Sequence, residues 1–202
     1  MSNKKAEFSK PWFRNPDWYM ILLTLVTAWI FYSQYWAMRL DTRPWIQVKP
    51  SDQNPVLQVG KPIAMPLQFV NVGKTPAKRF LAYMFVEVVD TDKPPHLPEL
   101  EGTEIRSWTR VTSGIVFPSV SLEGLAKSVK ATSGTDLPLT DAEYQRLMRG
   151  EAYLAVYAVA YYRDAFNTKH WTTFCGWHSF TAGNVSAGPC TAYNNVDDNI
   201  LW

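Results

Sequence analysis

Three residues on either side of one short turn have side chains suited to acid–base chemistry. Arg163 and Asp164 precede the turn at 165–168, and His170 follows it. If the turn joins two antiparallel strands, the three side chains meet across them, and a histidine beside a carboxylate is a common acid–base pair. Catalysis would also need a nucleophile and a pocket, and no serine or cysteine is placed to serve. We therefore interpret these residues as a structural polar cluster that fixes the register of the hairpin, and we predict no catalytic residue.

The remaining histidines do not form a metal-binding pattern. His170 and His178 share strand parity, but eight residues of extended chain separate them by roughly 26 Å. His96 lies in a proline-rich stretch without catalytic neighbours. Zinc sites use closely spaced Cys and His pairs, which are missing, and the segment 194–199 lacks the glycine and glutamate of an EF-hand loop. We expect no metal, and we expect 194–199 to be a solvated acidic tail.

The chain has two cysteines, Cys175 and Cys190, both near the C-terminal end of the sequence. In an exported domain such a pair is a disulfide candidate, whereas two free thiols are equally expected in a cytoplasmic domain. In the chain-entropy model, closing a loop of about 15 residues would contribute about 3 kcal/mol.

An uncharged stretch near the N-terminus predicts a transmembrane helix. The 19 residues at 18–36 contain no charged side chain. At about 1.5 Å per residue they reach roughly 28 Å, which is close to the thickness of the hydrocarbon core. Aromatic residues flank both ends, as in interfacial belts, and the segment 34–39 lacks the small residues of a signal-peptide cleavage site. We predict a polar and aromatic N-terminal segment at 1–17, a transmembrane helix at 18–38 and a β-sandwich domain at 43–202.

One face of this helix is a candidate interface with other helices. Its large side chains follow a 4-3-4-3-4 spacing and form a continuous stripe: Trp18, Leu22, Leu25, Trp29, Tyr32 and Trp36. Trp29 lies near mid-membrane although tryptophan prefers the interfaces, which favours contact with neighbouring helices or a flat apolar cofactor. The alternative is a lipid-facing anchor whose aromatic residues fall on one side by chance. The span has no histidine to ligate a haem or chlorophyll metal, and we predict no cofactor.

The charges favour one orientation and exclude one class of partner. Four Lys and Arg residues precede the span and three follow it closely, so the positive-inside rule slightly favours a cytoplasmic N-terminus and an exported domain. The formal net charge is +2 and no basic stripe is present, so we expect no nucleic-acid partner.

From residue 43 onward, short β-rich runs are broken by proline and glycine. The pattern predicts strands at 44–49, 56–59, 62–70, 79–89, 152–162 and 169–175. One short helix is expected over 139–149, with Thr140 and Glu143 in capping-box spacing and Gly150 at its end. The chain is therefore expected to be mainly β, with a sandwich and one short helix after the transmembrane helix.

Two connections are also expected from composition. The segment 71–77 is a turn in which Gly73 is free to take positive φ, and the acidic, proline-rich segment 90–106 is a surface loop.

Four motifs are spread over the β-rich part of the chain: Arg43-Pro-Trp-Ile46, Asn71-Val-Gly-Lys-Thr-Pro-Ala77, Tyr161-Tyr-Arg-Asp-Ala-Phe166 with His170-Trp-Thr-Thr-Phe-Cys175, and Cys190-Thr-Ala-Tyr-Asn-Asn-Val-Asp197. Together they resemble a widespread group of uncharacterised bacterial membrane proteins. The resemblance implies one membrane span joined to an Ig-like β-sandwich, and it implies no activity. With the charge rule, it predicts a single-pass protein of the bacterial inner membrane with a periplasmic domain. The chain departs from the pattern at Asn167-Thr168, where a glycine is more typical.

The leading functional hypothesis is a non-enzymatic accessory or assembly subunit. Its helix would dock into a larger integral-membrane complex, for example photosynthetic or respiratory, and its sandwich would brace that complex. The expected partners are other integral-membrane subunits and the lipid bilayer. The alternative is a membrane-tethered binding module for an envelope protein, a glycan or a solute, with the loops 91–106 and 176–190 and with Trp108, Trp171 and Trp177 as the place to bind it.

Overall fold

The computed structural model describes residues 16–51, 55–95, 108–130, 133–181 and 184–197. Contacts divide the chain into two units, residues 1–42 and residues 43–202, and each is described by itself. The elements, in chain order, are α1 (Pro16–Asp41), β1 (Ile46–Pro50), β2 (Ala64–Asn71), β3 (Ala77–Asp90), β4 (Thr109–Val116), β5 (Ser121–Lys127), α2 (Asp141–Met148), β6 (Ala152–Arg163), β7 (Lys169–Thr181), β8 (Asn184–Pro189) and β9 (Asn195–Val196). The predicted mainly β fold with an apolar N-terminal helix is confirmed.

The first unit contributes helix α1, which begins at Pro16. Proline suits this position, because the first N–H groups of a helix have no acceptor within the helix. Its stretch Trp18–Arg39 is long and apolar enough to cross a membrane. Three hydroxyls in this stretch donate to the carbonyl oxygen four residues earlier, at 2.8 to 2.9 Å: those of Thr24, Thr27 and Ser33. These bonds satisfy the hydroxyls inside the helix, so that they do not oppose transfer of the helix into hydrocarbon.

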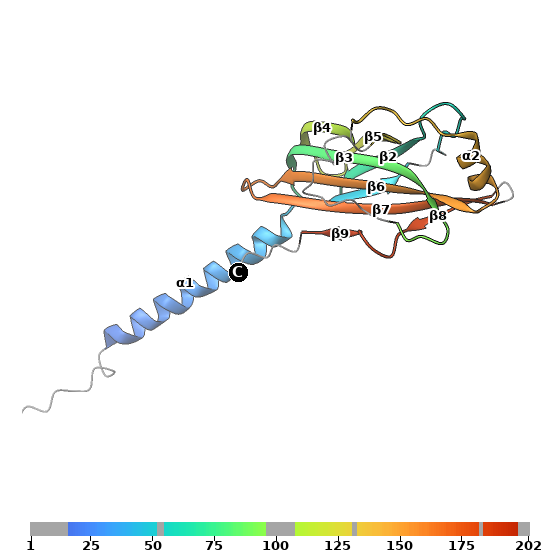
Figure 1. Cartoon of the computed structure of the whole chain (residues 1–202). Coiled ribbons are helices and arrows are strands. Elements are labelled where there is room, and N and C mark those ends of the chain that lie inside the picture. Colours follow the sequence, from blue (N-terminus) through green and yellow to red (C-terminus); the bar gives the residue numbers. More distant parts are fainter. Residues whose placement is uncertain (1–15, 52–54, 96–107, 131–132, 182–183, 198–202) are drawn as a thin grey trace, which may run out of the picture. The chain divides into compact units, whose positions relative to one another are not determined.

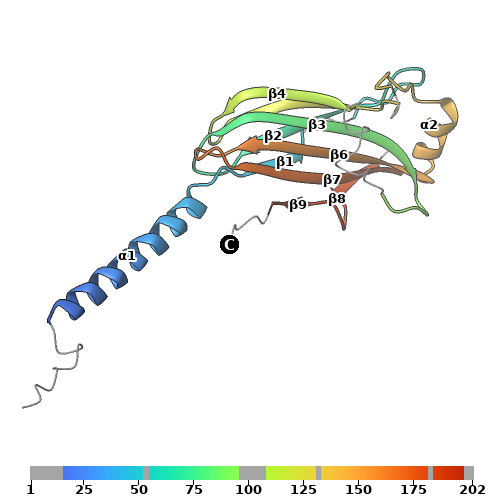
Figure 2. The ribbon, with the colours of Figure 1, turned by 60° about the vertical axis from the view of Figure 1, so that its left-hand side comes forward.

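The strands of the second unit form two layers. They pair in the order β1-β2-β5-β3-β6-β7-β8, with β4 on β3 and β9 on β7. One parallel bridge, between Phe85 of β3 and Lys127 of β5, connects β1, β2 and β5 to the remaining strands. Figures 1 and 2 show the long strands β3, β6 and β7 side by side, with β2 and β1 lying along one face of them. This grouping corresponds to the A-B-E and C-F-G layers of an Ig-like sandwich.

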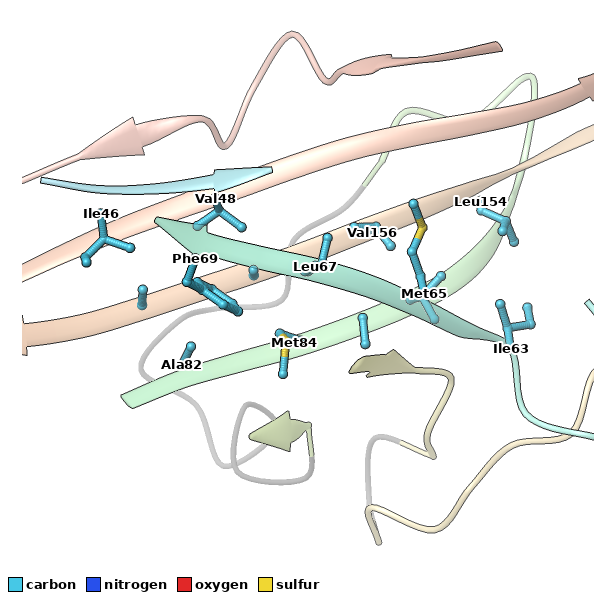
Figure 3. Packing of buried hydrophobic residues seen from close by; sticks show 14 of the residues in the cluster. Ile46, Val48, Ile63, Met65, Leu67, Phe69, Ala82, Met84, Leu154 and Val156 are labelled. Carbon is cyan, nitrogen blue, oxygen red and sulfur yellow. The ribbon is translucent and has the colours of Figure 1, made fainter. Parts of the chain in front are cut away.

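The main core lies between these layers. Strand β2 alternates strictly, so that Met65, Leu67 and Phe69 are fully buried while the residues between them are half-exposed. Figure 3 shows these side chains, with Ile46 and Val48 of β1, directed toward β3 and β6. The rings of Phe69 and Phe80 meet edge to face at 5.4 Å between their centroids.

A second apolar cluster covers the other face of β3 and β6. Phe85 stacks between Trp108 and Tyr157, with ring centroids 5.4 and 6.3 Å away. Cys175 and Cys190 belong to the same cluster. Because both faces are covered, β6 is apolar at both odd and even positions.

Helix α2 confirms the capping prediction. Thr140 is the N-cap, its hydroxyl accepts from the Glu143 N–H, and the Glu143 carboxylate accepts from the Thr140 N–H at 2.9 Å. Gly150 follows the helix at a φ of 71°, which suits a residue without a Cβ.

Several strands were not expected from the sequence. Strands β4, β5, β8 and β9 have few buried positions, and they therefore lack the apolar pattern on which strand prediction depends. Strand β7 extends to Thr181, past the predicted end at residue 175. The strand predicted at 56–59 is wrong, since only a single bridge joins Val56 to Ala64. Most of the predicted surface loop 90–106 lies outside the described residues.

Candidate functional site: a buried polar network at the hairpin end

The turn between β6 and β7 is built around the Asp164 side chain. Its Oδ1 accepts from the backbone N–H groups of Phe166 and Thr168, at 2.9 and 2.8 Å. The Asp164 N–H donates to the Thr168 carbonyl at 3.1 Å, which closes the turn. Asn167 adopts a φ of 67°, and asparagine tolerates this left-handed conformation better than most residues.

His170 lies between two carboxylates inside the domain. Its Nε2 is 3.3 Å from Asp164 Oδ2, and its Nδ1 is 2.7 Å from Asp197 Oδ2. For both contacts to be hydrogen bonds, both ring nitrogens must carry a proton. The ring is therefore held from both sides by carboxylates.

Asp197 connects this pair to the first residue of the β domain. Arg43 Nη2 donates to Asp197 Oδ1 at 2.5 Å and to the Asp197 carbonyl at 2.7 Å. The Trp171 N–H also donates to Asp197 Oδ1, at 3.3 Å, and the Asp197 N–H donates to the Trp171 carbonyl. Asp197 is 1% exposed, so the prediction of a solvated acidic tail is wrong at this residue.

The network of Arg43, Asp164, His170 and Asp197 is closed to solvent. The Arg43 guanidinium and the His170 ring face the two carboxylates, and all four residues are buried. Buried charges are tolerated when each is paired and hydrogen-bonded. The Arg43 guanidinium also lies over the Trp45 ring, 4.2 Å from its centroid.

Arg163 does not join the network, contrary to the prediction. It is half-exposed, and its Nη1 donates to the Asn167 carbonyl at 3.1 Å. Lys169 lies opposite Arg163 across the hairpin, with its side chain exposed. Asp164 and His170 are brought together as expected, but the cationic partner is Arg43, more than a hundred residues away in sequence.

The Asn71 side chain forms hydrogen bonds with the backbone of the turn that follows β2 and of the segment before β1. Its Oδ1 accepts from the N–H groups of Trp45 and Gly73, at 3.3 and 3.0 Å, and its Nδ2 donates to the carbonyls of Thr75 and Val116, at 2.8 and 2.9 Å. Gly73 does not have positive φ, so that expectation is wrong. A Cβ on Gly73 would lie 2.5 Å from the backbone of Arg43 and Trp45, so glycine is required here by close approach.

The two cysteines form a disulfide. Cys175 of β7 and Cys190 are bonded, with their Cα atoms 5.3 Å apart. The Asn194 side chain pairs with the backbone of Cys175 in both directions at 3.0 Å, and it also donates to the Cys190 carbonyl at 2.9 Å. Together these bonds fix the course of the chain from β8 to β9.

The arrangement offers little for catalysis or metal binding. No hydrogen bond of the described residues joins a serine or cysteine to the network, and its four members are buried. No group of three potential metal ligands occurs among the described residues. Burial raises the pKa of Tyr162, whose ring lies 5.6 Å from that of His170. Burial also lowers the pKa of His178, whose Nδ1 has no hydrogen-bond partner among the described residues.

The described surface of the domain has several hollows, of which two are relevant here. A groove of about 610 Å³ runs between β1 and β9, with Thr172 and Phe174 among its lining residues. A second hollow, of about 240 Å³, lies beside the disulfide between Thr91, Pro95, Tyr153 and Trp177. The Trp177 indole N–H donates to the Pro189 carbonyl at 3.2 Å.

The aromatic residues proposed for ligand binding divide into two kinds. Trp108 is 5% exposed and stacked on Phe85, so it is not available to a ligand. Trp171 and Trp177 are half-exposed. His96 and most of the loop 91–106 lie outside the described residues.

The stripe on α1 is presented on the helix surface. Trp29 is 69% exposed, and Leu22, Leu25 and Tyr32 are exposed as well, while Trp18 and Trp36 are half-exposed. Trp36 meets Tyr32 edge to face at 6.1 Å and lies 5.4 Å from the Arg39 guanidinium carbon.

Sequence reasoning missed Arg43 and Asp197 as site residues. The available signal was their position, since Arg43 begins one of the four motifs named above and Asp197 ends another. Their pairing could not be predicted, because they are 154 positions apart in the sequence.

No family model matches the chain, and no curated protein matches it either.

Proposed function

We propose that the protein is a non-enzymatic, membrane-anchored accessory or assembly subunit. Helix α1 docks through its stripe into a larger integral-membrane complex, and the β domain braces that complex at the membrane surface. The observation that carries the proposal is the exposed aromatic stripe, in which Trp29 is 69% exposed at the middle of an apolar helix. Tryptophan at this depth gains from packing against other helices more than from lipid chains.

The use of the polar residues supports the same proposal. The groups that could do acid–base chemistry, Asp164 and His170, are engaged with Arg43 and Asp197 inside the domain. In this proposal the network has a structural role, because the loss of one partner would leave another buried group without its hydrogen bonds. A periplasmic location belongs to this proposal, and the disulfide is compatible with it.

Replacement of Trp29 by leucine tests the proposal. Leucine suits the bilayer core, so Trp29→Leu should leave membrane insertion intact but release the protein from its complex. Phe31→Leu is the matched control, because Phe31 is 65% exposed and lies off the stripe. Native electrophoresis in mild detergent reads out the association. If Trp29→Leu and Phe31→Leu leave the assembly equally intact, the stripe is no interface and the helix is a simple tether.

The second candidate function, a tethered binding module, is favoured by the hollow beside the disulfide. Tyr153 and Trp177 supply aromatic surface there, and Thr91, Ser179 and Thr191 supply hydroxyls, a combination suited to a sugar or a small polar solute. Titration of soluble saccharides against the full chain, followed by Trp fluorescence, tests this function. A saturable change that Trp177→Phe alters and Tyr193→Ala does not would support it, and no saturable change would count against it.

A further inference from the structure

Three turns, each taken together with the ends of the strands that it joins, meet at one end of the β domain: 71–79 from β2 to β3, 116–121 from β4 to β5, and 163–169 from β6 to β7. Strand register places them together, because Lys78 lies opposite both Ile115 and Arg163. The Ser119 N–H also donates to the Asn71 carbonyl at 2.8 Å. Helix α2 lies at the other end of the domain (Figure 2).

Each of the three turns presents an apolar side chain to solvent. Val72 is 59% exposed, Phe117 is 56% exposed and Phe166 is 47% exposed. Large apolar side chains that are exposed on the same part of a surface often mark an interaction site, whereas single scattered ones do not. We name these three side chains the apolar tips.

Basic side chains accompany the apolar tips. Exposed or half-exposed cations in the same turns are Lys74, Lys78, Arg79, Arg163 and Lys169. The only carboxylate in these turns, Asp164, is buried in the network with His170. The exposed charge of the three turns is therefore entirely positive.

The opposite end of the domain is different, because acidic and basic side chains pair there. Asp90 pairs with Arg146 and Lys93, and Arg149 pairs with Glu151 at 2.8 Å. The concentration of positive charge at the three turns is thus a property of that end and not of the whole surface.

Chain connectivity brings this end close to the bilayer. Arg43, held in the network at this end, is two residues beyond Asp41, the last residue of α1. Two extended residues span about 7 Å, so the chain enters the domain at this end a short distance after the last residue of α1. Gly73 of the first turn packs directly on the backbone of Arg43 and Trp45.

We propose that the three turns form a membrane-docking surface. Their cations bind the anionic headgroups of phospholipids, and the apolar tips enter the interface between headgroups and acyl chains. Basic residues near a negatively charged leaflet each favour binding about fivefold, and apolar side chains add to this by burial. The inference rests on the proposed function, in which α1 spans the membrane. It gives the protein a second, salt-sensitive contact with the bilayer, through the β domain.

A nitroxide at residue 165, within the turn of Phe166, tests the docking. Ala165 is exposed, and because Cys175 and Cys190 are bonded, Ala165→Cys introduces one reactive thiol. The labelled full chain is placed in nanodiscs of phosphatidylcholine alone or with about a third phosphatidylglycerol. Collision with a water-soluble relaxation agent and with oxygen then measures the depth of the label by electron paramagnetic resonance.

In the anionic discs we expect the label to be shielded from the water-soluble agent, and we expect high salt to expose it again. Lys78→Gln with Lys169→Gln should shift the docked population roughly 30-fold toward undocked, since two cations are lost. The matched control is Lys61→Gln with Lys130→Gln, which removes two exposed cations from the other end of the domain and should change nothing. Phe166→Ser should weaken docking, whereas Leu137→Ser, at a side chain that is 48% exposed, should not.

A label that stays accessible to the water-soluble agent in both kinds of disc would overturn the proposal, and so would equal effects of the two double variants. A label that is shielded equally without anionic lipid would overturn the role of the cations. Loss of the protein from the discs altogether would instead show that α1 does not span, which is a failure of the proposed function and not of the docking surface.

Discussion

Removal of the Asp197 carboxylate should unfold the β domain more readily than any other single loss of charge in it. This carboxylate accepts hydrogen bonds from Arg43, His170 and Trp171, and its side chain is fully buried. Asp197→Ala leaves the Arg43 guanidinium buried without its carboxylate. Loss of one partner of a buried ion pair costs about 3–5 kcal/mol, which is a large part of the 5–15 kcal/mol that stabilises a typical domain.

Thermal unfolding of the full chain in mild detergent, followed by near-ultraviolet circular dichroism, measures this effect. With about 2–4 °C per kcal/mol for a domain of this size, the Tm should fall by about 6–20 °C. Asp136→Ala is the matched control, because Asp136 is 52% exposed and pairs with Lys127 only at 3.6 Å. Its effect should stay below about 1 kcal/mol.

A double-mutant cycle separates the ion pair from general disruption. In an Arg43→Met background the buried cation is gone, so Asp197→Ala should cost much less than it does in the original chain. If Asp197→Ala lowers the Tm no more than Asp136→Ala does, or if its cost is the same with and without Arg43, the network does not hold the domain as described.

Three further predictions concern other positions in the β domain. Gly73→Ala should cost about 1–3 kcal/mol of unfolding free energy through its clash with the Arg43 backbone, whereas Gly114→Ala, with no atom within 4 Å of its new Cβ, should be neutral or stabilising in the same denaturation assay. Reduction of the Cys175–Cys190 disulfide, which closes a separation of 15 residues, should cost about 3 kcal/mol, seen as a lower Tm with dithiothreitol. Because burial lowers the pKa of His178, the unfolded chain binds a proton below about pH 6.5 that the folded domain does not, so the unfolding free energy should fall as the pH drops below that value. His178→Phe should lessen this fall relative to the original chain, and an unchanged pH dependence of the Tm would contradict the assignment.

Local sequence patterns correctly predicted those features that depend only on residues close together in the sequence. The capping box of Thr140 and Glu143 and the end at Gly150 are determined within one turn of helix, and both are present in α2. Apolar runs likewise predicted β3 and β6, because both faces of these strands are covered. The exposed strands β4 and β8 carry no such signal and were missed.

The polar network illustrates the limit of such reasoning. Asp164 and His170 were paired correctly because a single hairpin joins them. Arg43 and Asp197 are 154 positions apart, and only the fold brings them together. Asp197 resembles a solvated residue within its acidic segment, and its burial depends on His170 of β7 and Arg43 at the start of the domain.

Native electrophoresis of the membranes of the producing organism, solubilised in mild detergent, tests the central claim most directly. The account predicts that the protein migrates in a large assembly at fixed stoichiometry, that Phe31→Leu leaves it there, and that Trp29→Leu releases it while it remains in the membrane fraction. Migration of the original chain as a lone monomer in those membranes would contradict the account.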